Sequence, residues 1–238
     1  MWDSIYFFIM VPMVYIAFAT LVIGIAFKFT IIFISPTIKG TIAVFPKGSV
    51  PKLCAVRDSF FMPSAFMKDK PFWVVIIAFH AAFLLLIIGH LELIREFAVI
   101  QVIPHEVFLG AGWVGIVLIV TTIYFLFRRF KTPWREISVP EDFIILLLLF
   151  LTFIFGSHMS LASRYGIAGF DIQVSEYREY LSSLFTTSPH VSRGILASPH
   201  YVIVALHVFF ANLFMMMFPF SKMIHSVFMF AAQFIKRK

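Results

Sequence analysis

The chain has 238 residues, of which 61% are hydrophobic and only 13% are charged, and its mean hydropathy is +0.97. This composition excludes an ordinary soluble domain, which is roughly half apolar and about a quarter charged, and it indicates a protein of the lipid bilayer. The formal charge of +7 does not indicate nucleic-acid binding, because the lysines and arginines lie in short loops between apolar segments, where they report membrane topology. The single Cys54 excludes an internal disulfide and an iron–sulfur cluster held by cysteines of this chain alone.

Five apolar segments are each long enough to cross a hydrocarbon core of about 30 Å, which takes about 20 residues. The first follows an N-terminus without a basic region and exceeds the apolar core of a signal peptide, so we expect a retained membrane helix. Because backbone groups in lipid must bond within the chain, we predict an all-α, polytopic bundle of five transmembrane helices that forms one membrane domain. The predicted spans are about 5–34, 72–93, 108–127, 143–161 and 200–235.

Two long connections separate these spans. Residues 36–71 are interrupted by prolines and glycines, which argues against a long helix, so we expect a polar loop. A second loop of about 35 residues leads from the fourth span to the fifth.

The lysines and arginines between the spans predict the orientation of the bundle. Six lie between the first two spans, four between the third and fourth, and four toward the C-terminus, and five crossings put these three regions on one side. The positive-inside rule therefore predicts an outside N-terminus, with the loop at 36–71 and the C-terminus in the cytoplasm. The opposite side has only Arg95, Arg164, Arg178 and Arg193.

Four histidines fall within two spans that run in opposite directions. His80 and His90 lie in the second span, with His80 nearer the cytoplasm, and His207 and His225 lie in the fifth, with His207 nearer the outside. Pairing by depth joins His80 with His225 and His90 with His207, which gives two bis-histidine sites. Neutral imidazoles are good axial ligands for haem iron, and two protein ligands on one iron favour electron transfer.

The spacings on the two helices do not match. The eighteen residues from His207 to His225 are five turns of an uninterrupted helix and span about 27 Å, whereas the ten from His80 to His90 span about 15 Å. Helix tilt and a kink at Pro219 would absorb part of the difference. A haem-free membrane transporter or a proton-conducting subunit remains the alternative, although a metal transporter would normally add carboxylate ligands, which are scarce in these spans.

The sequence around these histidines resembles a known family of membrane cytochromes. Gly89-His90, a histidine ten residues earlier, and HVFFANLFMMMFPFSKMIH, from His207 to His225, are similar to the gamma subunit of respiratory nitrate reductase. Relatives of that subunit include the membrane cytochromes of dissimilatory sulfite reductase-associated and heterodisulfide reductase complexes. The segment FPFSKMIH with its eighteen-residue spacing is the most specific part, whereas the other spans match in number and order.

The resemblance implies that the four histidines bind two b-type haems, with His80 and His225 at the inner haem and His90 and His207 at the outer haem. It also implies that the chain oxidises menaquinol or a similar quinol near the outer haem. Electrons would then cross the cell membrane to a cytoplasmic iron–sulfur subunit, and the catalytic reductase site would lie on a partner subunit.

The chain departs from the nitrate reductase gamma pattern in its long basic loop at 36–71. A lysine of that family's quinol site has no clear counterpart at the start of the third span. We therefore expect a partner of the sulfite- or heterodisulfide-associated type. The basic loop would offer a docking face for an acidic surface on this partner, although membrane topology alone also explains its charge.

Two histidines near the outer side are candidates for the quinol site. His105 and His158 are suited to accept a proton as a quinol is oxidised, and Glu106 is a weaker candidate. The alternative is that His105 and Glu106 form the polar start of the third helix.

Arg164, just after the fourth span, is the candidate partner of an outer haem propionate, because a guanidinium pairs well with a carboxylate. On the inner side Lys222, Arg128 or Arg129 could serve in the same way. An ordinary interfacial position would equally explain each of these residues.

Overall fold

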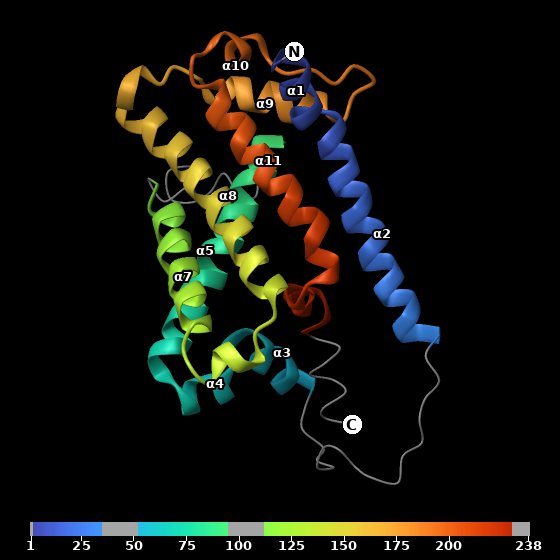
Figure 1. Ribbon diagram of the computed structural model, residues 1–238, viewed down its shortest axis with the longest axis vertical. Coiled ribbons are helices and arrows are strands. Elements are labelled where there is room, and N and C mark those ends of the chain that lie inside the picture. The colour runs from blue at the N-terminus through green and yellow to red at the C-terminus, as the bar shows by residue number, and fades with distance from the viewer. Residues whose placement is uncertain (1, 35–51, 95–111, 230–238) are drawn as a thin grey trace.

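The computed structural model describes residues 2–34, 52–94 and 112–229, and within these ranges it contains helices and no strand. α8 packs against α7 and α11, α11 also packs against α2, and α5 packs against α7 (Figure 1). The predicted all-helical class is therefore confirmed. The helices of this bundle are α2 (Pro12–Ile34), α5 (Lys70–Ile94), α7 (Trp113–Arg129), α8 (Pro140–Tyr165) and α11 (Tyr201–Met217).

Four stretches of the described chain are long and apolar enough to cross a membrane, which makes this a multi-pass membrane protein. They overlap the predicted first, second, fourth and fifth spans, although the last of them covers only the first part of the predicted span 200–235. The predicted third span corresponds to α7, which has 17 residues and contacts both α5 and α8. The four stretches are Asp3–Ile34, Lys70–Ile94, Pro140–Tyr165 and Tyr201–Phe220.

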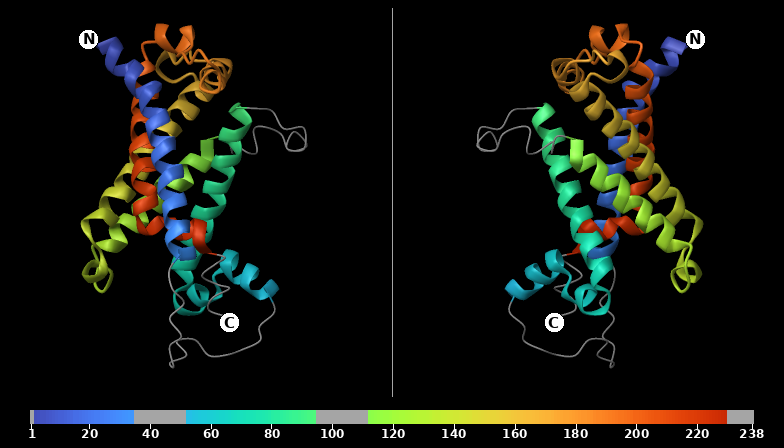
Figure 2. Two further views of the ribbon diagram at one scale, coloured as in Figure 1. Left: turned by 90° about the vertical axis from the view of Figure 1, so that its right-hand side faces the viewer. Right: turned by 90° about the vertical axis from the view of Figure 1, so that its left-hand side faces the viewer.

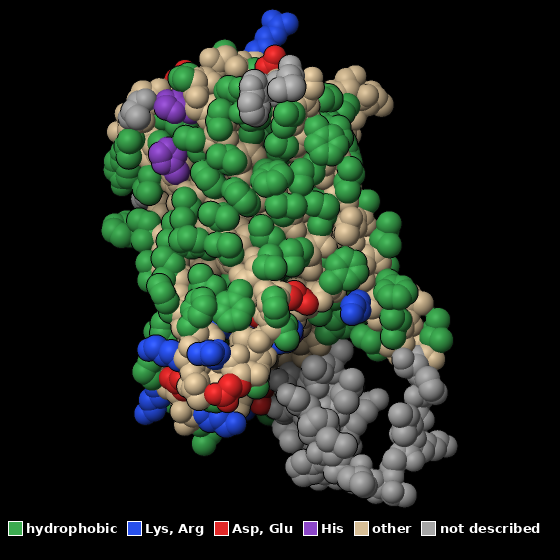
Figure 3. All heavy atoms as spheres, in the orientation of Figure 1, with side chains coloured by type: hydrophobic (Ala, Val, Ile, Leu, Met, Phe, Trp, Pro, Cys, Tyr) green, Lys and Arg blue, Asp and Glu red, His purple; other side chains and the backbone are tan. Residues whose placement is uncertain are grey.

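The connections gather at two opposite ends of the bundle (Figures 1 and 2). At one end, which we call the capped end, α9 (Val174–Ser183) and α10 (Arg193–Ala197) lie near α1 (Trp2–Met10). At the opposite end, which we call the basic end, lie α3 (Lys52–Phe61), α4 (Pro63–Lys68) and the connection between α7 and α8. Figure 3 shows Lys and Arg side chains around the connection between α7 and α8, with a broad hydrophobic band between the two ends. The basic connections that the structure describes therefore share one end of the bundle, as the predicted alternation of spans requires.

Part of the segment that we expected to be a loop is helical. α3 and α4 have 10 and 6 residues, so the absence of a long helix in this part is confirmed, whereas residues 36–51 lie outside the described chain. Met62 has a positive φ of 43° between the two short helices, where the chain turns. The indole N–H of Trp73 in α5 donates to the Phe61 carbonyl at 2.6 Å and fastens this turn to the bundle.

The first span bends at Pro12, between α1 and α2. A proline has no N–H and its ring interferes with the preceding turn, so carbonyls near it lose their helical partners. Two side chains from distant parts of the chain bond these carbonyls instead. Asn212 in α11 donates to the Ile9 carbonyl at 3.1 Å, and the Tyr180 hydroxyl in α9 donates to the Met10 carbonyl at 2.6 Å. The Ile9 and Met10 carbonyls at this bend are therefore bonded within the chain, as the lipid environment requires.

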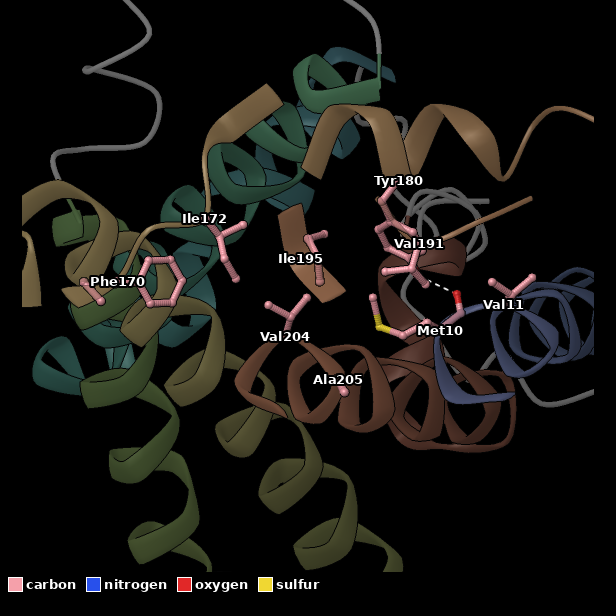
Figure 4. Packing of buried hydrophobic residues seen from close by; sticks show 10 residues of the cluster. Met10, Val11, Phe170, Ile172, Tyr180, Val191, Ile195, Val204 and Ala205 are labelled. Carbon is pink, nitrogen blue, oxygen red and sulfur yellow. Dashed lines mark hydrogen bonds between the residues drawn. The ribbon is translucent and has the colours of Figure 1, made fainter. Parts of the chain in front are cut away.

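The connection between α8 and α11, which we expected to be a loop, is a packed cap. Hydrogen bonds close it on itself: Ser198 Oγ donates to Asp171 at 2.7 Å, and the Gly194 N–H donates to Glu176 at 3.0 Å. Its apolar side chains pack against α1 and α11 and form one core cluster (Figure 4). The labelled members of this cluster are Met10, Val11, Phe170, Ile172, Tyr180, Val191, Ile195, Val204 and Ala205.

The predicted fifth span is not one continuous helix. α11 ends at Met217 and is followed by two 3-10 turns, η4 (Phe218–Phe220) and η5 (Lys222–Ile224). Pro219 ends the α-helix because it lacks an N–H and clashes with the carbonyl one turn earlier. Its ring is fully buried against α2, where a Cβ on Gly24 would lie 2.6 Å from the Pro219 Cβ. Glycine at position 24 therefore makes room for this break.

Candidate functional site

His90 and His207 face each other in the half of the bundle near the cap. His90 lies one turn before the end of α5, and His207 lies in the second turn of α11. Their ring centres are 6.3 Å apart and the ring planes differ by 26°. The structure thus brings together the two histidines that depth pairing joins as the outer site.

Backbone carbonyls bind the Nδ1 atoms of both rings. Nδ1 of His207 donates to the Thr152 carbonyl on α8 at 2.9 Å, and Nδ1 of His90 donates to the Leu86 carbonyl at 2.9 Å. Because a carbonyl oxygen only accepts, each neutral ring carries its proton on Nδ1 and leaves the lone pair of Nε2 for a metal. Hydrogen bonds of this kind orient metal-binding imidazoles and fix their tautomer.

Gly156 makes room for the His207 ring against α8. A Cβ at this position would lie 2.9 Å from Cε1 and 3.1 Å from Nδ1 of His207. Gly156 comes one turn after Thr152, so one face of α8 supplies both the space and the carbonyl. Our sequence analysis singled out neither residue, although a glycine among bulky apolar residues in a membrane span is a signal of close packing.

The separation of the two rings fits an iron atom between them. An imidazole–metal bond is about 2 Å long and the ring centre lies about 1 Å further on, so two imidazoles on opposite sides of one metal have centres about 6 Å apart. Within the described residues no group of three or more His, Cys, Asp or Glu side chains forms a metal site, and a haem needs only two axial ligands. The donors present therefore suit a bis-histidine haem.

His80 and His225 are exposed on the bundle surface, on α5 and just after η5 respectively. Nδ1 of His80 donates to the Ile76 carbonyl at 2.8 Å, and Nδ1 of His225 donates to the Lys222 carbonyl at 2.9 Å. Both rings therefore present Nε2, as His90 and His207 do. Among the contacts of the described residues there is none between these two rings, so their pairing stays a prediction.

The break after α11 changes the geometry expected of His207 and His225. An uninterrupted helix would place them on one face about 27 Å apart. This expectation is wrong, because Pro219 ends the helix between them and two 3-10 turns follow. The mismatch between the eighteen-residue and ten-residue spacings assumes two regular helices. The segment from His207 to His225 is not a regular helix, so the assumption does not hold for it.

A buried carboxylate at the basic end holds the segment that carries His225. Asp142, in the first turn of α8, is 2% exposed and pairs with Lys222 Nζ at 2.7 Å and Arg129 at 3.2 Å. The Val139 N–H also donates to its carboxylate at 3.1 Å. The Lys222 ammonium, one candidate for a haem propionate, is therefore bound to a protein carboxylate, and Asp142 is a residue that our sequence analysis did not identify.

Comparison with known families agrees with the geometry at the two paired histidines. The family model of the nitrate reductase gamma subunit matches residues 42–238. The chain belongs to the nitrate reductase gamma subunit family. The match includes all four histidines and confirms the resemblance. Among curated proteins, no sequence matches the chain.

Membership of the nitrate reductase gamma family establishes the general role. The chain is a membrane cytochrome b subunit, and it transfers electrons within a nitrate reductase-type oxidoreductase. Haem b is the cofactor of this family, and its members associate with the catalytic and iron–sulfur subunits of the complex. The 6.3 Å between the ring centres of His90 and His207 matches the separation of two imidazoles bound to one iron.

The other predicted site residues of this gamma-family chain lie toward the capped end or outside the described residues. His158 is exposed on α8, two residues after Gly156, and Arg164 is exposed in the last turn of the same helix. His105 and Glu106 lie outside the described residues. Their roles in quinol oxidation and propionate binding stay predictions.

Proposed function

We propose that this chain is a dihaem cytochrome b that oxidises menaquinol or a similar quinol and passes the electrons to an iron–sulfur subunit. His90 and His207 bind the outer haem near the capped end, and His80 and His225 bind the inner haem toward the basic end. The proposal rests on one observation at the capped end. The ring centres of His90 and His207 are 6.3 Å apart, and both rings donate their Nδ1 protons to backbone carbonyls.

Two haems at different depths suit electron transfer across the membrane. A hydrocarbon core of about 30 Å is divided into shorter electron hops when one centre lies toward each side. The basic residues at the end opposite the cap support a cytoplasmic basic end and an outside capped end. Quinol oxidation near the capped end would then release protons outside the cell membrane.

The chain's own residues hold and orient the cofactors, which supply the one-electron chemistry when bound. Each of the four histidines donates from Nδ1 to a carbonyl and presents Nε2. His158 on α8 and His105 would accept protons from the quinol, since an imidazole is suited to take a proton as an electron leaves. Arg164 would neutralise a propionate of the outer haem.

The electron-accepting partner is an iron–sulfur subunit that docks at the basic end, of the sulfite- or heterodisulfide-associated type. Exposed cations at this end, in the segment up to the start of α5 and in the connection between α7 and α8, support this placement, because they present a positive surface to an acidic partner. These residues are Arg57, Lys68, Lys70, Lys131 and Arg135.

A reduced-minus-oxidised spectrum of the purified chain tests the proposal. We expect split b-type bands and about two haems per chain. His90→Ala and His207→Ala should each remove the outer haem and quinol-driven reduction, whereas dithionite should still reduce the inner haem. His190→Ala is the matched control, because His190 lies in the cap and bonds Glu179 at 3.2 Å.

Two outcomes would contradict the proposal. A purified chain without haem would favour the haem-free transporter or proton-conducting subunit. If His90→Ala and His207→Ala spared quinol-driven reduction and His80→Ala abolished it, the outer and inner assignments would be reversed.

A further inference from the structure

The segment that carries His225 is not held in place by the helix before it. Pro219 ends α11 six residues before His225. Ser221 then adopts an extended conformation, with φ −91° and ψ 167°, between the two 3-10 turns. A metal-binding histidine must be held in a defined direction by its surroundings. The direction of His225 therefore depends on the contacts that this short segment makes.

Lys222 links His225 to α8 through two different groups. Its backbone carbonyl accepts the Nδ1 hydrogen bond of His225 at 2.9 Å. Its ammonium donates to Asp142 at 2.7 Å and to the Ile137 carbonyl at 3.4 Å. One residue thus connects the imidazole to the start of a neighbouring helix.

Asp142 is a well-fixed anchor for this link. Its carboxylate is 2% exposed, and it accepts the Val139 N–H and pairs with Arg129 as well as Lys222. Arg129 lies in the last turn of α7, so three separate segments meet at this carboxylate. A carboxylate in the first turn of a helix is further stabilised by the helix dipole.

We propose that Asp142 and Lys222 form a clasp that positions His225 as an axial ligand of the haem toward the basic end. The inference rests on the proposed function, because the haem is the one assigned to His80 and His225. Asp142 acts through Lys222 and is a positioning residue. The His90–His207 pair does not depend on this clasp, since the Thr152 carbonyl on α8 orients His207.

The test compares haem binding by full-length variants in which the clasp is broken or kept. Asp142→Asn retains the size of the side chain and removes its charge, and Lys222→Met removes the cation. Mutations of residues that hold a metal ligand in place commonly lower the affinity for the metal about 10- to 100-fold. We therefore expect a loss of this size in the affinity for the basic-end haem. The midpoint potential and bis-histidine spectrum of the His90–His207 haem should not change.

Two further variants serve as controls. Asp69→Asn removes another carboxylate at the basic end, which pairs with Arg128 at 3.0 Å; the described residues show no contact between Asp69 and the segment of His225. Both haems should remain in Asp69→Asn. Lys222→Arg keeps a cation that can pair with Asp142, and it should retain the basic-end haem.

The clasp is refuted if Asp142→Asn and Lys222→Met keep the basic-end haem at the level of Asp69→Asn. Loss of both haems in Asp142→Asn and Lys222→Met would also overturn it, because this would show a general folding role. A wild-type chain without haem would instead refute the proposed function. In that case hydrogen exchange of the haem-free chain tests the clasp, since Asp142→Asn, and not Asp69→Asn, should speed exchange in residues 220–226.

Discussion

The Nδ1 atom of His207 on α11 donates to the Thr152 carbonyl on α8 at 2.9 Å, so a neighbouring helix sets the direction of this imidazole. The rings of His80, His90 and His225 instead bond carbonyls three or four residues earlier in their own segments. The outer site is therefore sensitive to how closely α8 and α11 pack.

Gly156→Ala should disturb the outer site. The added Cβ would lie 2.9 Å from Cε1 of His207, which is too close for an ordinary contact, so the ring must move away from α8. We expect the bond to the Thr152 carbonyl to weaken and the affinity for the outer haem to fall about tenfold. The pyridine haemochrome content and the split b-type bands of the purified variant measure this loss.

Gly24→Ala is the matched control, because it makes the same change in another span. Its Cβ would meet Pro219 at 2.6 Å, next to the break that precedes His225. Both substitutions gain about 1 kcal/mol of helix propensity, so this term cancels in the comparison. We expect Gly24→Ala to affect the basic-end haem and Gly156→Ala the outer one. The reverse pattern would contradict the assignment of the two sites.

The helical class, four of the spans and the approach of His90 to His207 were predictable from the sequence. Apolar length and the distribution of charge are properties of contiguous segments, and antiparallel spans bring residues of equal depth together. The carbonyl that accepts the Nδ1 hydrogen bond of His207 was not predictable, because a backbone carbonyl such as that of Thr152 has no signature in the sequence. Gly156, a glycine among bulky apolar residues, is the sequence feature that indicates the close packing at this ring.

The break after α11 and the structure of the cap depend on contacts between distant segments. Pro219 suggested a kink, but the full break also needs the space left by Gly24 on α2, almost 200 residues earlier. In the cap, Tyr180 bonds the Met10 carbonyl across 170 residues of sequence. Local patterns do not report such partners, so the connection before α11 read as a loop.

Tyr180→Phe should destabilise the cap. The buried hydroxyl donates to the Met10 carbonyl at 2.6 Å, and its loss leaves that carbonyl without this donor beside Pro12. Leaving a buried acceptor unpaired costs about 1–3 kcal/mol, so we expect a lower unfolding temperature in detergent. Circular dichroism at 222 nm during heating measures the change.

Tyr15→Phe is the control for the cap, because Tyr15 also bonds a distant carbonyl. Its hydroxyl donates to Leu184 at 2.5 Å, but its side chain is 44% exposed. An exposed carbonyl can find another partner, so the effect should be smaller than that of Tyr180→Phe. Equal losses in the two variants would show that burial does not decide the contribution of Tyr180.

His190 in the cap should titrate above its usual range. Its pKa is raised because Nδ1 donates to the Ser188 carbonyl at 2.9 Å and Nε2 bonds Glu179 at 3.2 Å. A raised folded-state pKa means that the stabilisation is complete below the usual pKa of about 6.5 and is lost as the pH rises through the folded value. Glu179→Gln should lower the pKa only partly, since the Ser188 bond remains. An NMR titration of the His190 ring checks this, and an unchanged pKa in Glu179→Gln would contradict it.

Arg128→Lys should destabilise the basic end although it conserves the charge. The Arg128 guanidinium lies 3.7 Å from the Phe72 ring centre and 4.4 Å from that of Trp134, and it pairs with Asp69 at 3.0 Å. A lysine lacks the planar group that stacks on both rings, so we expect a loss of about 1–2 kcal/mol in the free energy of unfolding. Arg135→Lys, at an exposed position in the connection that follows α7, is the control and should unfold like the wild type. Thermal unfolding of both variants in the same detergent tests this. If Arg128→Lys unfolds at the wild-type temperature, the contribution of Arg128 comes from its charge and not from stacking.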